Sequence, residues 1–243
     1  LTPIKNALTI LSSGRCGILG ENAVKFIDMA KRNVENLTNI INDILDINKI
    51  EAGKMDFNYR IMNIHSVIET VKTNFECVAK EHEIIFKTDE QANLPDIYAD
   101  SQRLGQVLTN LVSNAIKFPP IGKNIIIKSE LKNASDIPYN RYFDNEIKML
   151  DGNYIIVSVI DEGIGIREEN LLKAFDKFTQ IENSLSRKVG GTGLGLPIAK
   201  QLIKAHKGTI WCDSEENKGS SFYFALPVSI EKIEEKTIQK ELL

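Results

Sequence analysis

Apolar residues recur at intervals of three and four through the first fifty positions of the chain, which is the spacing of a buried helix face. Residues 1–11 and 21–53 are therefore predicted to form two helices, joined by a connector that contains Ser and Gly. Two helices of this kind cannot bury their apolar stripes on each other alone. The pattern favours a four-helix bundle made by pairing two chains, with packing against the rest of the same chain as the alternative.

After residue 63 the pattern becomes mixed, with amphipathic helices between short apolar strands. Helices are predicted at 64–79, 101–118, 171–175 and 194–205, and strands at 84–86, 97–98, 124–129, 154–160, 209–212 and 221–226. The polar segment 133–153 is too long for a tight hairpin and is expected to be an excursion or a partly mobile loop. The sequence thus predicts an α+β protein with a helical hairpin (1–55), a linker (56–63), a second domain (64–230) and a charged tail or linker (231–243).

Composition narrows the choice of partners. The 243 residues include 30 Lys and Arg against 33 Asp and Glu, a formal charge of −3, so no general attraction to nucleic acid or to an anionic membrane is expected. Cys16, Cys77 and Cys212 are odd in number and far apart, which fits a reducing compartment and argues against structural zinc or disulfides. No apolar run approaches the roughly 20 residues of a membrane span. The segment is expected to be cytoplasmic, without membrane contact of its own, and, since it begins at Leu1, to be a fragment.

A glycine-rich segment precedes the last predicted helix. Gly190, Gly191, Gly193 and Gly195 are four glycines in six residues, and they let the backbone turn through positive φ and approach a ligand closely. Unpaired N–H groups at the start of a helix favour an anion such as phosphate. The segment is not a P-loop, and no strand precedes it as a dinucleotide fingerprint requires. A flexible surface loop is the alternative.

Two groups of polar residues lie in otherwise apolar surroundings. Asn110, Asn114 and Lys117 are four and three residues apart, so they share one face of a predicted helix. Asn oxygens suit Mg²⁺, and a Lys one turn on can reach phosphate oxygens, although a lone Asn is more often capping or solvated. Asp161 ends an apolar strand before a Gly-x-Gly turn. It is either a turn residue or the acceptor for one buried polar hydrogen.

Taken together, these motifs resemble those of sensor histidine kinases. Residues 100–118 look like the N box of that family, 161–166 like its G1 box, 175–178 like its F box, 190–196 like its G2 box and 219–222 like a final glycine motif, in the family's order and spacing. Residues 44–54 resemble the second helix of its dimerisation and histidine-phosphotransfer hairpin. The resemblance extends over residues 1–228.

The resemblance implies a GHKL-type catalytic ATP-binding domain at 64–230, with the Bergerat fold of a mixed sheet and helices on one face. It implies that Asp161 accepts the adenine amino hydrogen, Asn114 ligates Mg²⁺, Asn110 orients the site and Lys117 contacts the phosphates. Three glycines would close a lid over the triphosphate, with two basic residues as auxiliary cations. Together with further contacts, the residues implied to bind nucleotide are Gly163, Gly165, Ile166, Phe178, Arg187, Lys188, Gly191, Thr192, Gly193, Leu194, Gly195 and Leu196.

One departure concerns the phosphate acceptor, which in the family is a His before a Thr-Pro or similar pair. Here the pair is Thr2-Pro3, so the acceptor is expected upstream of Leu1. None of His65, His82 and His206 is expected to replace it, and His206, near a helix end, is expected to be solvated or capping. Thr2 matches the family position that orients water for dephosphorylating the regulator, which leaves a phosphatase role open.

The leading hypothesis is therefore an ATP- and Mg²⁺-dependent protein-histidine kinase core. It would form a homodimer through residues 1–55 and pass phosphate to the receiver domain of a response regulator, in the cytoplasm or as the cytoplasmic part of a membrane-anchored sensor. One alternative is another ATPase of the superfamily, which normally has Glu where Asn110 stands. A catalytically inert dimeric scaffold that binds nucleotide is the second alternative.

Overall fold

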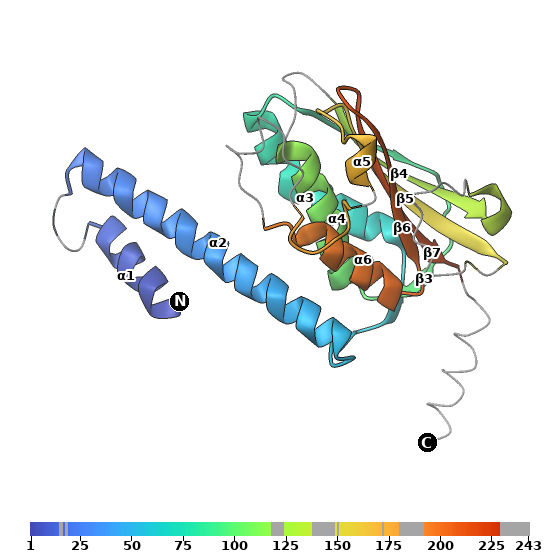
Figure 1. The fold of residues 1–243 in the computed structure, drawn as a ribbon, viewed down its shortest axis with the longest axis horizontal. Coiled ribbons are helices and arrows are strands. Elements are labelled where there is room, and N and C mark those ends of the chain that lie inside the picture. Colours follow the sequence, from blue (N-terminus) through green and yellow to red (C-terminus); the bar gives the residue numbers. More distant parts are fainter. Residues whose placement is uncertain are drawn as a thin grey trace. The chain divides into compact units, whose positions relative to one another are not determined.

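The computed structural model describes residues 1–14, 17, 19–117, 124–137, 149, 151–171, 173–179 and 192–228. The chain divides into two compact units, Leu1–Met55 and Asp56–Leu243. The first unit consists of two helices, α1 (Thr2–Ser12) and α2 (Glu21–Glu51), which pack on each other (Figure 1). Both helices lie where the spacing of apolar residues predicts them.

The helices of the first unit have a proline at the start of α1 and an ion pair between α1 and α2. Pro3 occupies the first turn of α1, where its missing N–H breaks no hydrogen bond of the helix. An exposed ion pair joins Lys5 of α1 to Glu35 of α2 at 3.5 Å, and such pairs contribute little to stability. Neither these helices nor any other in the described residues is both long and apolar enough to cross a bilayer.

The second unit is built from a mixed sheet and three longer helices. Its elements are β1 (Arg60–Met62), α3 (Ile64–Glu81), β2 (Ile85–Glu90), β3 (Ile97–Ala99), α4 (Ser101–Lys117), β4 (Asn124–Asn133), the 3₁₀ turn η1 (Ala134–Asp136), β5 (Asn153–Asp161), α5 (Glu168–Leu171), α6 (Gly195–Ala205), β6 (Thr209–Glu215) and β7 (Gly219–Pro227). Five strands form the sheet in the order β2-β4-β5-β7-β6. The β2-β4 pair is parallel and the other pairs are antiparallel, so the expected α+β class with a mixed sheet is confirmed.

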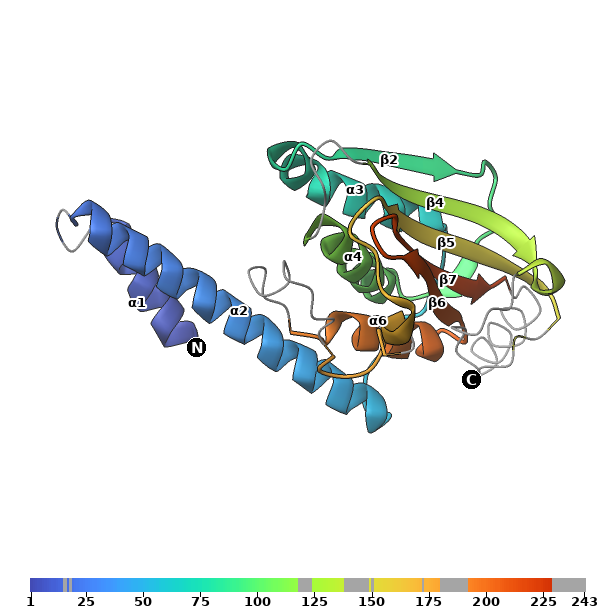
Figure 2. The ribbon, with the colours of Figure 1, turned by 45° about the horizontal axis from the view of Figure 1, so that its top comes forward.

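Helices α3, α4 and α6 lie together on one face of this sheet (Figure 2). Alternate residues of β5 explain why: Ile155, Val157 and Val159 are fully buried, and successive side chains of a strand point to opposite faces. The helices that cover them carry apolar stripes of their own, with seven buried residues on α4 and five on α6. The main core therefore lies between the sheet and this helix layer.

A smaller apolar cluster lies away from the helices. It contains Trp211, Tyr154, Ile156 and Ile137, and the ring of Trp211 stacks on that of Tyr223 with centroids 5.1 Å apart. Ile137 comes from the segment expected to be an excursion between β4 and β5. Its described part is thus packed, since residues 134–137 form η1 and a buried contact, whereas residues 138–148 lie outside the described residues.

Two short elements differ from the sequence prediction. The expected helix at 171–175 is instead the single turn α5, Glu168–Leu171, which overlaps the predicted range only at Leu171. Strand β1 lies within residues 56–63, which were expected to be a linker, and it pairs antiparallel with β3. Such short elements escape prediction because a strand of three residues is defined by its partner and not by its own periodicity.

We predict that Gly105→Ala stabilises the second unit. Gly105 lies in the interior of α4, and a Cβ there would come no closer than 3.9 Å to Val67, so Ala brings better helix propensity without a clash. The free energy of unfolding should rise by about 0.5–1 kcal/mol. Urea unfolding followed by the fluorescence of Trp211, the single tryptophan of the chain, measures the change.

The matched control is Gly208→Ala, because its Cβ would lie 2.3 Å from the carbonyl oxygen of Ala225. This second change should lower the free energy of unfolding by about 1–3 kcal/mol. Equal effects of the two substitutions would contradict the packing described for α4 and β7.

Candidate functional site

Helix α4 carries three of the predicted site residues beside its buried stripe. The helix is fixed at its start by Asp100, whose Oδ1 accepts two backbone N–H groups of the first turn at 3.0 and 3.1 Å. Asn110, Asn114 and Lys117 are half-buried. Their neighbours on the helix form the buried face: Leu104, Val107, Leu108, Leu111, Val112, Ala115 and Ile116. The three polar side chains therefore lie at the border of the core and not in open solvent.

Helix α6 begins where the glycine-rich segment ends, and its first residue is joined to α4. Asn110 Nδ2 donates a hydrogen bond to the carbonyl oxygen of Gly195 at 3.0 Å. One turn earlier, Thr192 Oγ1 accepts the N–H of Leu194 at 3.1 Å, and the Leu194 side chain is fully buried. The structure thus brings Asn110, Thr192, Leu194 and Gly195 together at the N-terminus of a helix, where the macrodipole favours an anion.

The predicted F-box residue Phe178 lies against the same segment. Gly193 has φ +68°, and a Cβ on it would lie 3.0 Å from the backbone carbon of Phe178. Phe178 itself has a positive φ of 59°, which is rare for a bulky residue, and its side chain is 66% exposed. Glycine at 193 is therefore required by the approach of two chain segments as well as by its own conformation.

Asp161 ends β5 with a carboxylate that is only partly paired. Its Oδ1 accepts the N–H of Gly163 at 2.8 Å and that of Ser220 at 3.3 Å. Burial raises the pKa of Asp161 to about 6, against the opposing effect of these two hydrogen bonds. Its Oδ2 accepts no hydrogen bond from the residues that the structure describes. A half-buried acceptor of this kind is suited to a polar hydrogen from a ligand.

The glycines around Asp161 are demanded by the chain itself. Gly165 has φ +67°, and a Cβ there would lie 2.0 Å from the carbonyl oxygen of Glu215. A Cβ on Gly219 would lie at the same distance from the carbonyl oxygen of Asp161. The turn after β5 is thus pressed against the β6-β7 hairpin. A ligand of Asp161 must therefore approach the carboxylate from a side that the hairpin does not occupy.

Two serines of this hairpin belong to the site although the sequence analysis assigned them no role. The N–H of Ser220 bonds to Asp161, and Ser214 Oγ accepts the N–H of Ile166 at 2.8 Å while donating to the carbonyl oxygen of Gly219 at 2.8 Å. Ser214 thereby fixes the backbone of the predicted binding residue Ile166. In the sequence, Ser220 could have been identified from its place in the final glycine motif. Ser214 could not, because only its long-range contacts in the structure relate it to the site.

Comparison with known proteins places this arrangement in a family. Residues 99–230, more than half of the chain, match the family of histidine kinase-, DNA gyrase B-, and HSP90-like ATPases. The chain belongs to this ATPase family. The matched range includes α4, α6, β5 and β7, which carry the residues described above.

Within the ATPase family, sensor kinases match nearly the whole chain, which confirms the resemblance seen in the motifs. The chain is 31% identical to sensor histidine kinase WalK of Bacillus subtilis over 239 residues and 31% identical to the autoinducer 2 sensor kinase/phosphatase LuxQ of Vibrio vulnificus over 236 residues. The two matches cover 96% and 97% of this chain but 35% and 26% of those proteins. The chain therefore spans about a third or less of the curated relatives it matches.

Solved histidine kinase structures share the fold. The catalytic domain of histidine kinase ThkA is 30% identical, with a TM-score of 0.54, and the match covers 70% of this chain and 96% of that one. Full-length ShkA in complex with AMPPNP is 23% identical, with a TM-score of 0.72 and coverage of 93% and 43%. At this level of identity the likeness to ShkA concerns the fold alone.

Of the other residues expected at the nucleotide site, some lie within the described part of the chain and some do not. Leu196 lies half-buried in the first turn of α6. Arg187, Lys188 and Gly191 lie outside the described residues. Thr2 belongs to the first unit, whereas the other site residues belong to the second.

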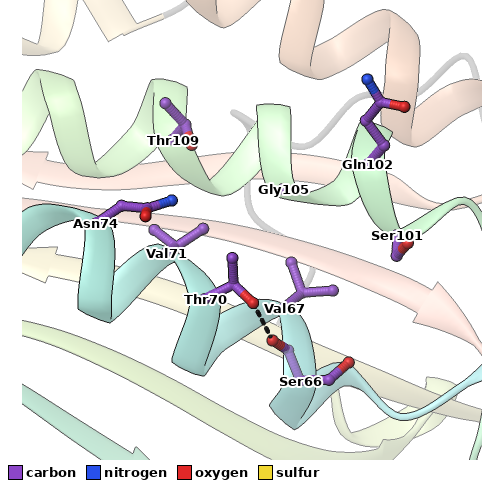
Figure 3. Close-up of a pocket in the computed structure, with 9 residues that line it drawn as sticks. All are labelled: Ser66, Val67, Thr70, Val71, Asn74, Ser101, Gln102, Gly105 and Thr109. Carbon is purple, nitrogen blue, oxygen red and sulfur yellow. Dashed lines mark hydrogen bonds between the residues drawn. The ribbon is translucent and has the colours of Figure 1, made fainter.

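A pocket of about 400 Å³ lies apart from these groups, between α3 and α4 (Figure 3). Its lining consists of Ser66, Val67, Thr70, Val71, Asn74, Ser101, Gln102, Gly105 and Thr109. None of these is a predicted nucleotide residue, and none is charged. A triphosphate requires cations or many N–H donors, so this pocket is not the nucleotide site.

We predict that Asp161→Asn removes a pH-dependent loss of stability. The pKa of this carboxyl is about 6 in the folded chain and near 3.8 when exposed. Between these values the folded state binds more protons than the unfolded state, so rising pH destabilises the fold. The stability advantage of the variant should therefore grow between pH 4 and pH 6 and stay constant above, at about 2–3 kcal/mol.

Urea unfolding of both proteins between pH 4 and pH 7.5 measures this difference. The matched control is Asp151→Asn, at an exposed carboxylate in a bend, which should not reproduce the effect of Asp161→Asn. A difference between wild type and Asp161→Asn that stays constant with pH would show that this carboxyl is not perturbed.

Proposed function

We propose that the chain is the ATP-dependent protein-histidine kinase core of a two-component signalling system. It binds Mg-ATP and transfers the γ-phosphate to a His, from which an Asp of a response regulator receives it. The observation that carries this proposal is the partly paired carboxylate of Asp161, combined with a helix N-terminus that Asn110 holds against α4. The first group suits a base with an amino hydrogen, and the second suits phosphates.

In this proposal Asp161 Oδ2 accepts the exocyclic amino hydrogen of adenine. Its Oδ1 is already held by the N–H groups of Gly163 and Ser220, so the carboxylate is oriented before the base arrives. Ile166, fixed through Ser214, forms part of the wall beside the base. Preorganised acceptors of this kind bind without the cost of ordering a mobile side chain.

The phosphates lie, in this proposal, between α4 and the start of α6. Asn114 supplies an amide oxygen to Mg²⁺, Asn110 holds Gly195, and Lys117 contacts phosphate oxygens. The described residues contain no group of three or more His, Cys, Asp or Glu side chains that would hold a metal by themselves. This donor set fits Mg²⁺, which typically takes most of its ligands from water and phosphate oxygens. Gly191, Gly193 and Gly195 are proposed to close a lid over the triphosphate, with Arg187 or Lys188 as an auxiliary cation.

Phosphoryl transfer then depends on positioning and charge neutralisation, which these residues offer. The described histidines are unsuited to accept the phosphate. His65 pairs with Glu90, His82 caps the end of α3 and His206 is buried. The acceptor is therefore proposed to be a His upstream of Leu1, with Thr2 close to it and available to orient water in a phosphatase reaction.

The proposed partner is the receiver domain of a response regulator. Histidine kinase ThkA, 24% identical in this comparison, has been crystallised in complex with the response regulator protein TrrA, and LuxQ is named a sensor kinase/phosphatase. Those descriptions concern the relatives. For this chain, a receiver partner and a cytoplasmic place of action stay predictions.

We predict that the chain binds Mg-ATP and that a version extended upstream past the acceptor takes up label from γ-labelled ATP. The label should be acid-labile and base-stable, as a phosphohistidine is. Asp161→Ala should weaken ATP binding about 10- to 100-fold, because it removes the acceptor for the base, whereas Asp151→Ala should have no effect. If neither version is labelled although both bind ATP, the kinase proposal fails and a nucleotide-binding scaffold or plain ATPase is the better account.

The first unit supports a dimeric kinase. Its large apolar side chains stay exposed on two packed helices, and on α2 they include Leu37 at 45%, Ile41 at 40% and Ile44 at 37%. These three are four and three residues apart and so form one stripe along α2. An exposed apolar stripe of this length indicates an interface. We propose that a second copy of the chain covers it, in a four-helix bundle made by residues 1–55 of both chains.

We predict that Ile41→Glu dissociates the dimer. A carboxylate buried without a partner should weaken association by at least about 100-fold. The control is Asn39→Glu, because Asn39 is exposed and lies on the opposite side of the helix, about 160° away. Analytical ultracentrifugation over a range of concentrations measures the effect. A monomeric wild-type chain at tens of micromolar, or a dimer unaffected by Ile41→Glu, would refute the interface.

A further inference from the structure

Helix α6 is joined to α4 and to the residue before it by a hydrogen bond at each end of α6. At the site end Asn110 Nδ2 donates to Gly195 O at 3.0 Å, and at the other end the N–H of Asp100 donates to His206 Nε2, also at 3.0 Å. The two spans match, because Asp100 and Asn110 are ten residues apart and Gly195 and His206 are eleven, or roughly 15 and 16.5 Å of helix. The two bonds therefore help to fix the register of α6 on α4, in addition to the apolar packing between the helices.

The ring of His206 is fixed in one orientation and one tautomer. It is 6% exposed, and its Nδ1 donates to the carbonyl oxygen of Leu202 at 2.7 Å, which leaves Nε2 as the acceptor for Asp100. Burial lowers the pKa of the imidazole and so favours this neutral form. The expectation of a solvated His206 is therefore wrong, while its bond to the last turn of α6 does resemble a cap.

The chain that enters the second unit is attached to the same point. The N–H of Asn58 donates to Asp100 Oδ2 at 2.8 Å, and the Tyr59 hydroxyl donates to the carbonyl oxygen of Ala205 at 2.9 Å. The ring of Tyr59 lies 5.1 Å from that of His206. Residues 58 and 59 thus bond directly to the start of α4 and to the end of α6. A displacement of this segment would be transmitted to both helices.

We propose that His206 and Tyr59 are positioning residues for nucleotide binding, which hold α6 in register on α4 and couple residues 56–62 to the start of α6. The inference rests on the proposed function, because it assigns a regulatory input to the same nucleotide site. By linkage, any movement of residues 56–62 that shifts α6 changes the affinity for nucleotide, and bound nucleotide resists that movement in return. The phosphate-binding end of α6 thereby responds to a contact at its opposite end.

The test compares His206→Ala with His206→Gln in the full chain. Gln can supply an acceptor for the N–H of Asp100, whereas Ala cannot. We expect His206→Ala to raise the Kd for Mg-ATP about tenfold at temperatures where the protein is fully folded, and His206→Gln to stay within about twofold of wild type. A lower melting temperature for His206→Ala with an unchanged Kd would show that the residue acts on stability alone and would overturn the proposal.

Tyr59→Phe tests the segment with a smaller change, because it removes one hydroxyl and keeps the ring. Its control is Tyr98→Phe, since Tyr98 stacks on Tyr59 but is 45% exposed and has no hydroxyl bond to α6 among the described contacts. Without nucleotide, amide hydrogen exchange in residues 192–198 should become at least about threefold faster in Tyr59→Phe and His206→Ala, and should not change in Tyr98→Phe. Unchanged exchange in both variants would refute the coupling.

The exchange measurement keeps the two proposals separable. If the wild-type chain binds no Mg-ATP, the proposed function fails, while the exchange rates at residues 192–198 still decide whether His206 and Tyr59 position α6. If ATP binds and the exchange rates do not respond to either variant, the positioning proposal alone is rejected.

Discussion

Asp100 fixes how the main parts of the second unit meet. The residue is 5% exposed, and its carboxylate oxygens accept N–H groups from the first turn of α4 and from Asn58. Its backbone N–H donates to Nε2 of His206. A buried charge is tolerated only when such bonds replace its hydration. An arrangement that separated α4 from the entering chain would remove N–H partners from this carboxylate. An arrangement that moved the end of α6 away would leave the backbone N–H of Asp100 without its partner. Asp100 and the bond between Asn110 and Gly195 together fix α6 on α4.

Asp161 shows the opposite treatment of a carboxylate in the same unit. Two N–H groups bond to one of its oxygens, the described residues leave the other without a donor, and burial raises its pKa to about 6. Full pairing, as at Asp100, would make the fold more stable but would leave no acceptor for a ligand. In the proposed function, partial pairing lowers the stability of the fold and keeps an acceptor for a ligand with a polar hydrogen.

The sequence sufficed for the elements whose pattern is long. The stripes of α4 and α6 and the apolar run of β5 predicted the helix layer, the central strand and the position of Asp161 at its end. The sequence did not predict strand β1, the packing of residues 134–137 within the 133–153 segment, or the burial of His206. Each of these depends on a partner distant in sequence, namely β3, Trp211 and Asp100, and periodicity carries no information about such partners.

The glycines of the motifs illustrate the same limit within the site. The family resemblance implies that Gly165 binds nucleotide. The contact that forbids a side chain there, however, is with the carbonyl oxygen of Glu215. At Gly219, likewise, a Cβ would clash with the backbone carbonyl oxygen of Asp161. Both glycines let the β6-β7 hairpin reach the turn after β5, and this approach brings the N–H of Ser220 to the carboxylate. In the proposed function their part is therefore indirect, because they permit the backbone packing that orients Asp161.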